Sequence, residues 1–146
     1  METIKKVIKK KFSESSVNKL RKFIANIKAI GSGHNLDRLG KIYKTDKAGP
    51  HFYPPHYKLH LKKYKYGRIN FLEIGVGGWN HPFYGGNSLR MWKKYFPFGK
   101  IFSLDIFDKS AVQEKRINNH LPRRWIEASG KALLRHVKID IFAGIF

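Results

Sequence analysis

The sequence contains no cysteine and no apolar run long enough to cross a bilayer. Without cysteine there can be no disulfide bridge, no cysteine-ligated metal and no cysteine nucleophile. The segment from Met1 to Lys11 is rich in lysine but leads into no continuous apolar stretch, so we predict no cleaved secretory signal. These absences favour a cytoplasmic protein, because a chain without disulfides fits a reducing compartment.

Acidic residues are also scarce. The 146 residues include 10 Asp and Glu against 30 Lys and Arg, which gives a net charge of +20, and +14 of it lies within residues 1–68. Such a charge predicts attraction to phosphates, anionic lipids or acidic partners. The length and the hydrophobic content of 42% predict one folded domain with a basic leader attached.

Residues 1–33 form this leader, in which apolar residues recur at helical spacing between lysines. The first apolar stripe consists of Ile4, Val7, Ile8 and Phe12, and the second of Val17, Leu20, Phe23, Ile24, Ile27 and Ile30. One interpretation is peripheral binding to an anionic membrane surface through residues 1–30; the other is a pair of helices packed on the core. The lysines lack an aromatic platform on which bases could stack, so we predict no specific nucleic-acid recognition.

Residues 34–68 are rich in loops. We expect one helical turn over 34–40 and a helix over 57–65, because prolines at positions 50, 54 and 55 interrupt the chain between them. Three histidines lie here, namely His51, His56 and His60. No carboxylate is close to them in sequence, so we predict no metal site.

A strand, a glycine turn, a helix and a second strand follow in that order. A nearly continuous apolar run over 69–76, interrupted by Glu73, is typical of a buried parallel strand. A turn-rich segment over 79–87 leads to Ser88, which we expect to cap a helix over 89–96. The second strand, over 101–106, carries Asp105 near its end. The pattern predicts a nucleotide-binding βαβ unit.

This unit indicates the ligand's chemistry. Glycines at a strand's carboxyl end let the backbone approach a ligand, and a carboxylate on the next strand can accept ribose hydroxyls. A dinucleotide site needs glycine where this sequence has Asn80, and places its acid roughly 20 residues on. Here Asp105 lies 30 residues after Gly75. The sequence therefore favours a ribose-containing ligand other than NAD.

The motif Leu72-Glu73-Ile74-Gly75-Val76-Gly77-Gly78 resembles the first motif of class I S-adenosylmethionine-dependent methyltransferases. Four further stretches narrow the resemblance to the macrolide-sugar O-methyltransferases of the mycinamicin and tylosin type: Thr45 to Lys47, His51 to Tyr57, Gly85 to Lys93, and Leu104 to Ser110. The resemblance covers about residues 39–117. It implies a Rossmann-like α/β fold, S-adenosylmethionine as cofactor, a sugar or glycoside as acceptor, and the Mg²⁺ of related enzymes, whose ligands we do not find.

The resemblance also implies roles for particular residues. Those expected around the methionine part of the cofactor are Glu73, Gly75, Gly77 and Gly78, with Ser88 and Arg90 as helpers. Asp105 is expected at the ribose, and Tyr53 and Tyr57 over the cofactor's amino-acid end. Packing of both tyrosines against the sheet is the alternative. No catalytic residue can be assigned.

The resemblance ends near Ile117, and only 41 residues follow Asp105. We therefore divide the chain into a basic helical leader (1–33), a cofactor-binding half-domain (34–117) and a divergent tail (118–146) that could add a helix turn and a short strand. We hypothesise that the chain is the amino-terminal half of a methyltransferase, with an incomplete fold and no catalytic half, as a frameshift or premature stop would produce; a genuine small domain is the alternative. Reading the downstream nucleotides in the other two frames tests this. The alternative function is a non-catalytic basic module that binds nucleic acid or an anionic membrane.

Overall fold

The computed structural model describes residues 13–32, 34–48, 54–120 and 138–144. Its helices are α2 (Glu14–Ile30), α3 (Leu36–Tyr43), α4 (Pro54–Leu61) and α5 (Asn87–Tyr95), with short 3-10 helices η1 (Asp46–Ala48), η2 (Lys62–Tyr64) and η3 (Ser110–Val112). The strands are β1 (Asn70–Ile74), β2 (Lys100–Leu104), β3 (Ile117–His120) and β4 (Ile141–Gly144). The helix expected over Ile4 to Phe12 lies outside the described residues.

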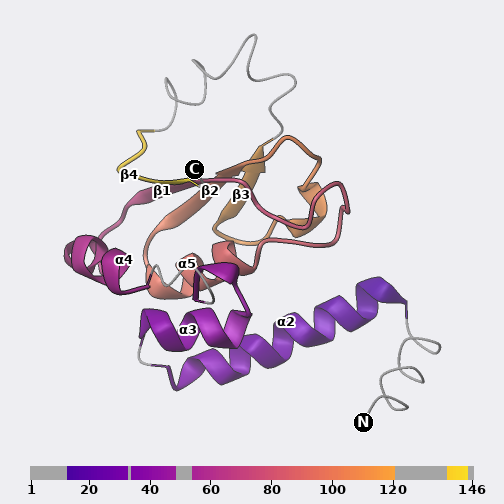
Figure 1. Cartoon of the computed structure of the whole chain (residues 1–146), viewed down its shortest axis with the longest axis horizontal. Helices are drawn as coiled ribbons and strands as arrows, with labels where there is room; N and C mark the ends of the chain where they lie inside the picture. The colour runs from indigo at the N-terminus through magenta and orange to yellow at the C-terminus, as the bar shows by residue number, and fades with distance from the viewer. Residues whose placement is uncertain (1–12, 33, 49–53, 121–137, 145–146) are drawn as a thin grey trace.

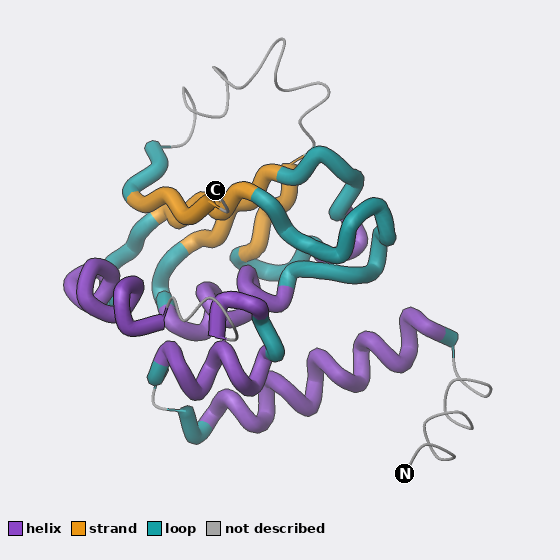
Figure 2. The backbone as a smooth tube through the Cα atoms, viewed as in Figure 1, coloured by secondary structure: helices purple, strands orange, loops and turns teal. Residues whose placement is uncertain are grey.

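The strands form one parallel sheet in the order β3-β2-β1-β4 (Figures 1 and 2). The predicted βαβ unit is confirmed, since α5 joins β1 to its parallel neighbour β2. The short strand expected in the tail is β4, which pairs with the free edge of β1. The result is the incomplete Rossmann-like fold that the motifs predict. In such sheets, ligands bind beyond the carboxyl ends of the strands near the point where the strand order reverses, which is at β1 in this sheet.

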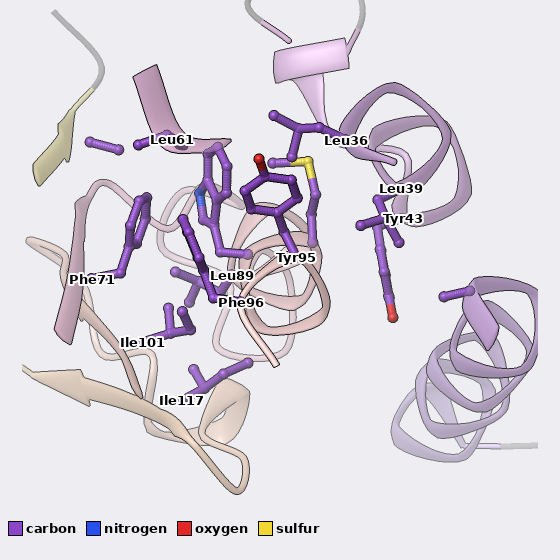
Figure 3. Close-up of a cluster of buried hydrophobic side chains, with 14 of the residues drawn as sticks. Leu36, Leu39, Tyr43, Leu61, Phe71, Leu89, Tyr95, Phe96, Ile101 and Ile117 are labelled. Atoms are coloured by element: carbon purple, nitrogen blue, oxygen red, sulfur yellow. The ribbon is translucent and has the colours of Figure 1, made fainter. Parts of the chain in front are cut away.

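The core lies between the sheet and α5. Phe71, Ile101 and Ile117 are paired across β1, β2 and β3, so their side chains lie in one row on the same face of the sheet. All three are fully buried. Figure 3 shows this row facing the aromatic side chains of α5 and its end. The ring centroid of Phe71 lies 4.8 Å from that of Trp92 and 5.3 Å from that of Phe96. This packing fixes α5, and with it the turn that precedes it, against the sheet.

Helices α3 and α4 differ in their bounds from the sequence prediction. The turn expected over 34–40 is instead the eight-residue α3, because the Asn35 side chain accepts a hydrogen bond from Arg38 N and starts the helix at Leu36. The helix expected over 57–65 begins earlier, at Pro54, and gives way to η2 after Leu61. Proline is well suited to the first turn of a helix, where its missing N–H has no partner to lose.

Helix α2 confirms the second leader helix but leaves its apolar stripe uncovered. Of its residues only Ala29 is buried, while five large apolar side chains are between 44% and 73% exposed: Leu20, Phe23, Ile24, Ile27 and Ile30. The helix lies on the side of α3 away from the sheet, and its amino-terminal half extends past α3 (Figure 1). Within the described residues no helix is long and apolar enough to span a membrane.

Candidate functional site

The turn from β1 into α5 lies at the carboxyl end of the sheet. Gly75, Gly77 and Gly78 have φ angles of 86°, 75° and 77°, in the left-handed region that favours glycine. A Cβ atom on Gly78 would lie 2.4 Å from the carbonyl carbon of Tyr84, whereas one on Gly77 would meet nothing within 4 Å. Gly78 thus allows two backbone segments to pack together, and Gly77 presents an open backbone face that a ligand can approach.

The chain re-enters the fold at Gly85 and Gly86. Gly86 N donates to Val76 O at 2.9 Å, and Gly86, with a φ of 71°, is the N-cap residue that precedes α5. The predicted capping role of Ser88 is therefore wrong, because the helix already starts at Asn87 and Ser88 lies within its first turn. Ser88 is buried, and its hydroxyl favours the charged form of the neighbouring Glu73. The first N–H groups of α5 have no partner within the helix, as at every helix start.

Asp105 lies directly beside the glycine turn, as the βαβ pattern predicts. Its Oδ2 accepts a hydrogen bond from Val76 N at 2.6 Å, and its Oδ1 accepts one from Phe107 N at 3.0 Å. Each carboxylate oxygen can accept a second hydrogen bond. Asp105 therefore joins the ends of β1 and β2 and retains acceptor capacity for hydroxyl groups of a ligand.

Glu73 is fully enclosed at the end of β1, below the turn. Its Oε1 lies 3.0 Å from the ammonium of Lys47 in η1, which is also buried. Burial raises the pKa of the Glu73 carboxyl, and Lys47 and Ser88 oppose that rise. Burial would lower the pKa of Lys47, but the Glu73 carboxylate outweighs it and raises that pKa above its ordinary value. The pair anchors the turn from inside, and Glu73 has no surface open to solvent.

Arg90 is buried in α5 and makes its contacts with the protein. Its Nε donates to Glu114 Oε1 at 2.7 Å, and its Nη1 donates to Gly85 O at 3.2 Å. Lys93 Nζ donates to the other oxygen of Glu114 at 3.1 Å. Burial would raise the pKa of Glu114, but Arg90 and Lys93 outweigh it and leave that pKa below its usual value. The cluster holds Gly85, and so the returning side of the glycine loop, in place.

The two tyrosines expected over the cofactor have different outcomes. Tyr53 lies outside the described residues. Tyr57 is half-buried in α4, where its ring meets the edge of Trp92 with centroids 5.1 Å apart and packs against the core. The structure thus brings Tyr57 to the helix face of the sheet.

The histidines form no metal site in the part of the chain that the structure describes. His56 and His60 are exposed on α4, His51 lies outside the described residues, and no cluster of three His, Asp or Glu side chains is present among those described. A cavity of about 520 Å³ is lined by Leu59, His60, Lys62 and Lys63. It lies at α4 and η2, at the opposite end of the sheet from the glycine turn (Figure 1).

The sequence did not predict the contacts of two buried lysines in this region, Lys47 and Lys109. Lys47 belongs to a motif noted for its resemblance, but its pairing with Glu73 spans 26 positions and has no local signal. Lys109 likewise lies in a motif next to Asp105, and its side chain reaches back 25 to 30 positions into the glycine loop. Both are lysines with almost no exposed surface, which composition cannot distinguish from the many solvated lysines.

Several known proteins are similar in sequence to more than half of this chain, although no model of a known protein family matches the chain. Mycinamicin VI 2''-O-methyltransferase of Micromonospora griseorubida is 51% identical over 84 residues, which are 57% of this chain and 21% of that protein. Demethylmacrocin O-methyltransferase of Streptomyces fradiae is 48% identical over 84 residues, with the same coverage. A Streptomyces olivaceus 8-demethyl-8-alpha-L-rhamnosyl tetracenomycin-C 2'-O-methyltransferase is 43% identical over 98 residues, 65% of this chain and 26% of that protein.

Solved structures agree with these sequences. The MycE methyltransferase from the mycinamycin biosynthetic pathway, in complex with Mg, SAH and mycinamycin VI, superposes with a TM-score of 0.58 at 38% identity. The match covers 71% of this chain and 36% of that one. A crystal form with Mg and SAH gives a TM-score of 0.59 and covers 34% of that chain. The chain thus spans between a fifth and about a third of the length of these relatives.

Proposed function

Because more than half of this chain is homologous to macrolide-sugar O-methyltransferases, we propose that it binds S-adenosylmethionine at the carboxyl ends of β1 and β2. The observation that carries the proposal is the open backbone face at Gly77, with the Asp105 carboxylate within 2.6 Å of the same turn. A ribose-bearing cofactor needs both features side by side. The structure neighbours that hold SAH share this segment at 38% identity.

The residues divide into two roles in this proposal. Gly75 and Gly77 let the cofactor's methionine part approach the backbone, and Asp105 accepts hydrogen bonds from its ribose hydroxyls. Glu73 and Arg90 keep the turn in shape through Lys47 and Glu114. Bound S-adenosylmethionine would supply an electrophilic methyl group on its sulfonium sulfur. The described residues do not fit the Mg of the related complexes, since they form no cluster of ligands for it.

Calorimetric titration with S-adenosylmethionine tests the proposal. We expect heat of binding with the intact chain and none with Gly77→Asn, because the added side chain fills the open face. Asparagine tolerates a positive φ better than most residues, so the strain of the substitution is small. Gly31→Ala is the matched control, since a Cβ there also meets nothing within 4 Å but lies far along the chain from the turn. No binding by the intact chain, or equal binding by Gly77→Asn, contradicts the proposal.

We further propose that the chain on its own binds the cofactor without transferring its methyl group. The support is that no metal-ligand cluster is present among the described residues, and that the chain spans only between a fifth and about a third of the length of its relatives. The acceptor would be a sugar hydroxyl, as the names of the relatives indicate. Transfer of labelled methyl from S-adenosylmethionine to a macrolide glycoside, measured with the purified chain, would contradict this second proposal and leave the first intact.

A second candidate function, peripheral binding to an anionic membrane, is favoured by α2. Its five exposed apolar side chains accompany exposed Lys19, Arg21 and Lys28 on the same helix. An amphipathic helix of this composition binds membranes through apolar burial and attraction to anionic lipids. The exposed apolar residues favour a lipid surface over nucleic acid, which would leave them unused.

Sedimentation with vesicles of phosphatidylglycerol and phosphatidylcholine tests this candidate. We expect binding that falls with salt and is lost in Phe23→Asp, while vesicles of phosphatidylcholine alone bind weakly. Leu59→Asp, which changes an even more exposed apolar residue on α4, is the control. Equal binding by Phe23→Asp and Leu59→Asp would overturn the candidate.

A further inference from the structure

The segment Trp79–Tyr84 forms a loop between the two sides of the glycine turn. Its base is narrow: a Cβ on Gly85 would lie 2.2 Å from Gly77 O, and one on Gly78 would lie 2.4 Å from Tyr84. Trp79 has a φ of 46° and is 85% exposed. A bulky residue with a positive φ persists only where surrounding contacts hold it there.

The contact inside the loop is the ammonium of Lys109. Its Nζ donates to Trp79 O at 2.5 Å, to His81 O at 3.1 Å and to Tyr84 O at 3.3 Å. An ammonium has three N–H donors, so three carbonyls use all of them. Lys109 is only 2% exposed, although it belongs to a surface segment between β2 and η3. It therefore satisfies three backbone carbonyls of one loop at once.

Lys109 also connects this loop to η3 and β3. Its own carbonyl accepts hydrogen bonds from Val112 N at 2.9 Å and from Asn119 Nδ2 at 3.0 Å, which ties its backbone to η3 and β3. Burial lowers the pKa of Lys109, and the nearby Asp105 opposes that effect. The same carboxylate holds Val76 N of the turn. Lys109 and Asp105 thus fix the two sides of the glycine turn from one short segment.

We propose that Lys109 is a positioning residue, whose ammonium holds the loop Trp79–Tyr84 in shape and thereby keeps the Gly77–Gly78 turn in its cofactor-binding form. This inference rests on the proposed binding of S-adenosylmethionine. Without the ammonium, the carbonyls of Trp79 and Tyr84 lose this donor and His81 O keeps only Tyr84 N, at 3.3 Å. The loop then opens, and the backbone face at Gly77 is no longer fixed. A ligand that needs a fixed backbone then binds more weakly because it must pay the cost of ordering it.

The test compares Lys109→Met with Lys115→Met, which removes an exposed lysine six positions along. We expect Lys109→Met to speed amide hydrogen exchange within residues 77–86 and to weaken S-adenosylmethionine binding about tenfold, consistent with the loss of hydrogen bonds to a charged group. Lys115→Met should change neither. If Lys109→Met does not fold, Lys109→Arg is compared with Lys115→Met instead. Because arginine keeps the charge and the N–H donors, we expect smaller changes in amide exchange and in cofactor affinity than those given for Lys109→Met.

Acetylation of the native chain gives a second measurement that needs no substitution. Lys109 should react far more slowly than Lys115, and equal rates would overturn the enclosed ammonium. Unchanged cofactor affinity in a folded Lys109→Met would overturn the positioning role. If the unsubstituted chain binds no S-adenosylmethionine, the proposed function itself is wrong. If the unsubstituted chain and Lys109→Met bind it equally well, only the positioning role of Lys109 is wrong.

Discussion

Helices α5 and α2 have equally clear apolar periodicity in sequence, yet their apolar side chains differ in burial. In α5, Leu89, Met91 and Trp92 are almost completely buried, with Trp92 against Phe71 of the sheet and Met91 beside Gly40 of α3. In α2, Phe23 and Ile30 are 62% and 73% exposed. Periodicity therefore predicts that a helix forms and which side is apolar, but not what covers that side.

The charged contacts of the two regions also differ in burial. Glu73 of β1 is paired in the interior with Lys47 of η1. The described side-chain links from α2 to the residues around the glycine turn are more exposed: Glu14 contacts Tyr84 and His81, and Lys22 lies 3.8 Å from Glu114. Exposed ion pairs contribute little to stability, whereas breaking a buried pair is costly. The free energy of unfolding should accordingly depend on the first region far more than on the second.

The largest expected contrast is between two phenylalanines. Phe71→Ala removes a fully buried ring that contacts Trp92 and Phe96, and should lower the free energy of unfolding by about 3–5 kcal/mol. Phe23→Ala changes an exposed ring on α2 and should stay within about 0.5 kcal/mol of wild type. Urea unfolding followed by circular dichroism measures both. Similar losses for the two variants would mean that α2 is packed into the core.

The next effect comes from the buried ion pair. Lys47→Met leaves the Glu73 carboxylate buried without its partner and should cost about 3 kcal/mol. Lys41→Met, on the exposed side of α3, is the matched control and should be close to neutral. The double variant Lys47→Met with Glu73→Leu should recover much of the loss in urea unfolding, because no unpaired charge remains. A double variant as unstable as Lys47→Met would contradict this account.

A smaller effect is expected at Glu114, and it should depend on pH. A carboxyl whose pKa is lowered by folding contributes stability above its unfolded pKa, and loses it as the pH falls through the folded value. Arg90 and Lys93 lower the pKa of Glu114 in spite of its burial. Glu114→Gln should therefore cost about 1–2 kcal/mol at pH 7. The difference from wild type should shrink below about pH 4 in thermal unfolding. A constant difference at all pH values would argue against the charge.

The sequence predicted the parts of the fold that depend on local pattern. The two apolar runs and the glycine turn between them predicted β1, α5, β2 and the position of Asp105 correctly. The capping role of Ser88 was predicted wrongly, because a left-handed Gly86 is the N-cap of α5 and Ser88 lies inside the first turn. The pairings of Lys47 and Lys109 could not be predicted, since each joins residues more than 20 positions apart.

The smallest expected contrast compares two helix caps. Asn35 accepts from Arg38 N at the start of α3, whose Leu36, Leu39 and Tyr43 are buried. Ser13 accepts from Ser16 N at the start of the exposed α2. Losing either cap costs its helix about 1 kcal/mol. Because α3 is part of the core, Asn35→Ala should lower the global free energy of unfolding by that amount.

Ser13→Ala should instead act locally, by fraying the first turn of α2 while the core stays folded. We expect a global change below about 0.5 kcal/mol, with faster amide exchange confined to the first turns of the helix. Native-state hydrogen exchange distinguishes a local from a global effect, since a global one would speed exchange in β1 and β2 too. If Ser13→Ala destabilised the strands as much as Asn35→Ala does, α2 would be energetically part of the β1–α5 unit, and the exposed stripe would need a different explanation from an uncovered peripheral helix.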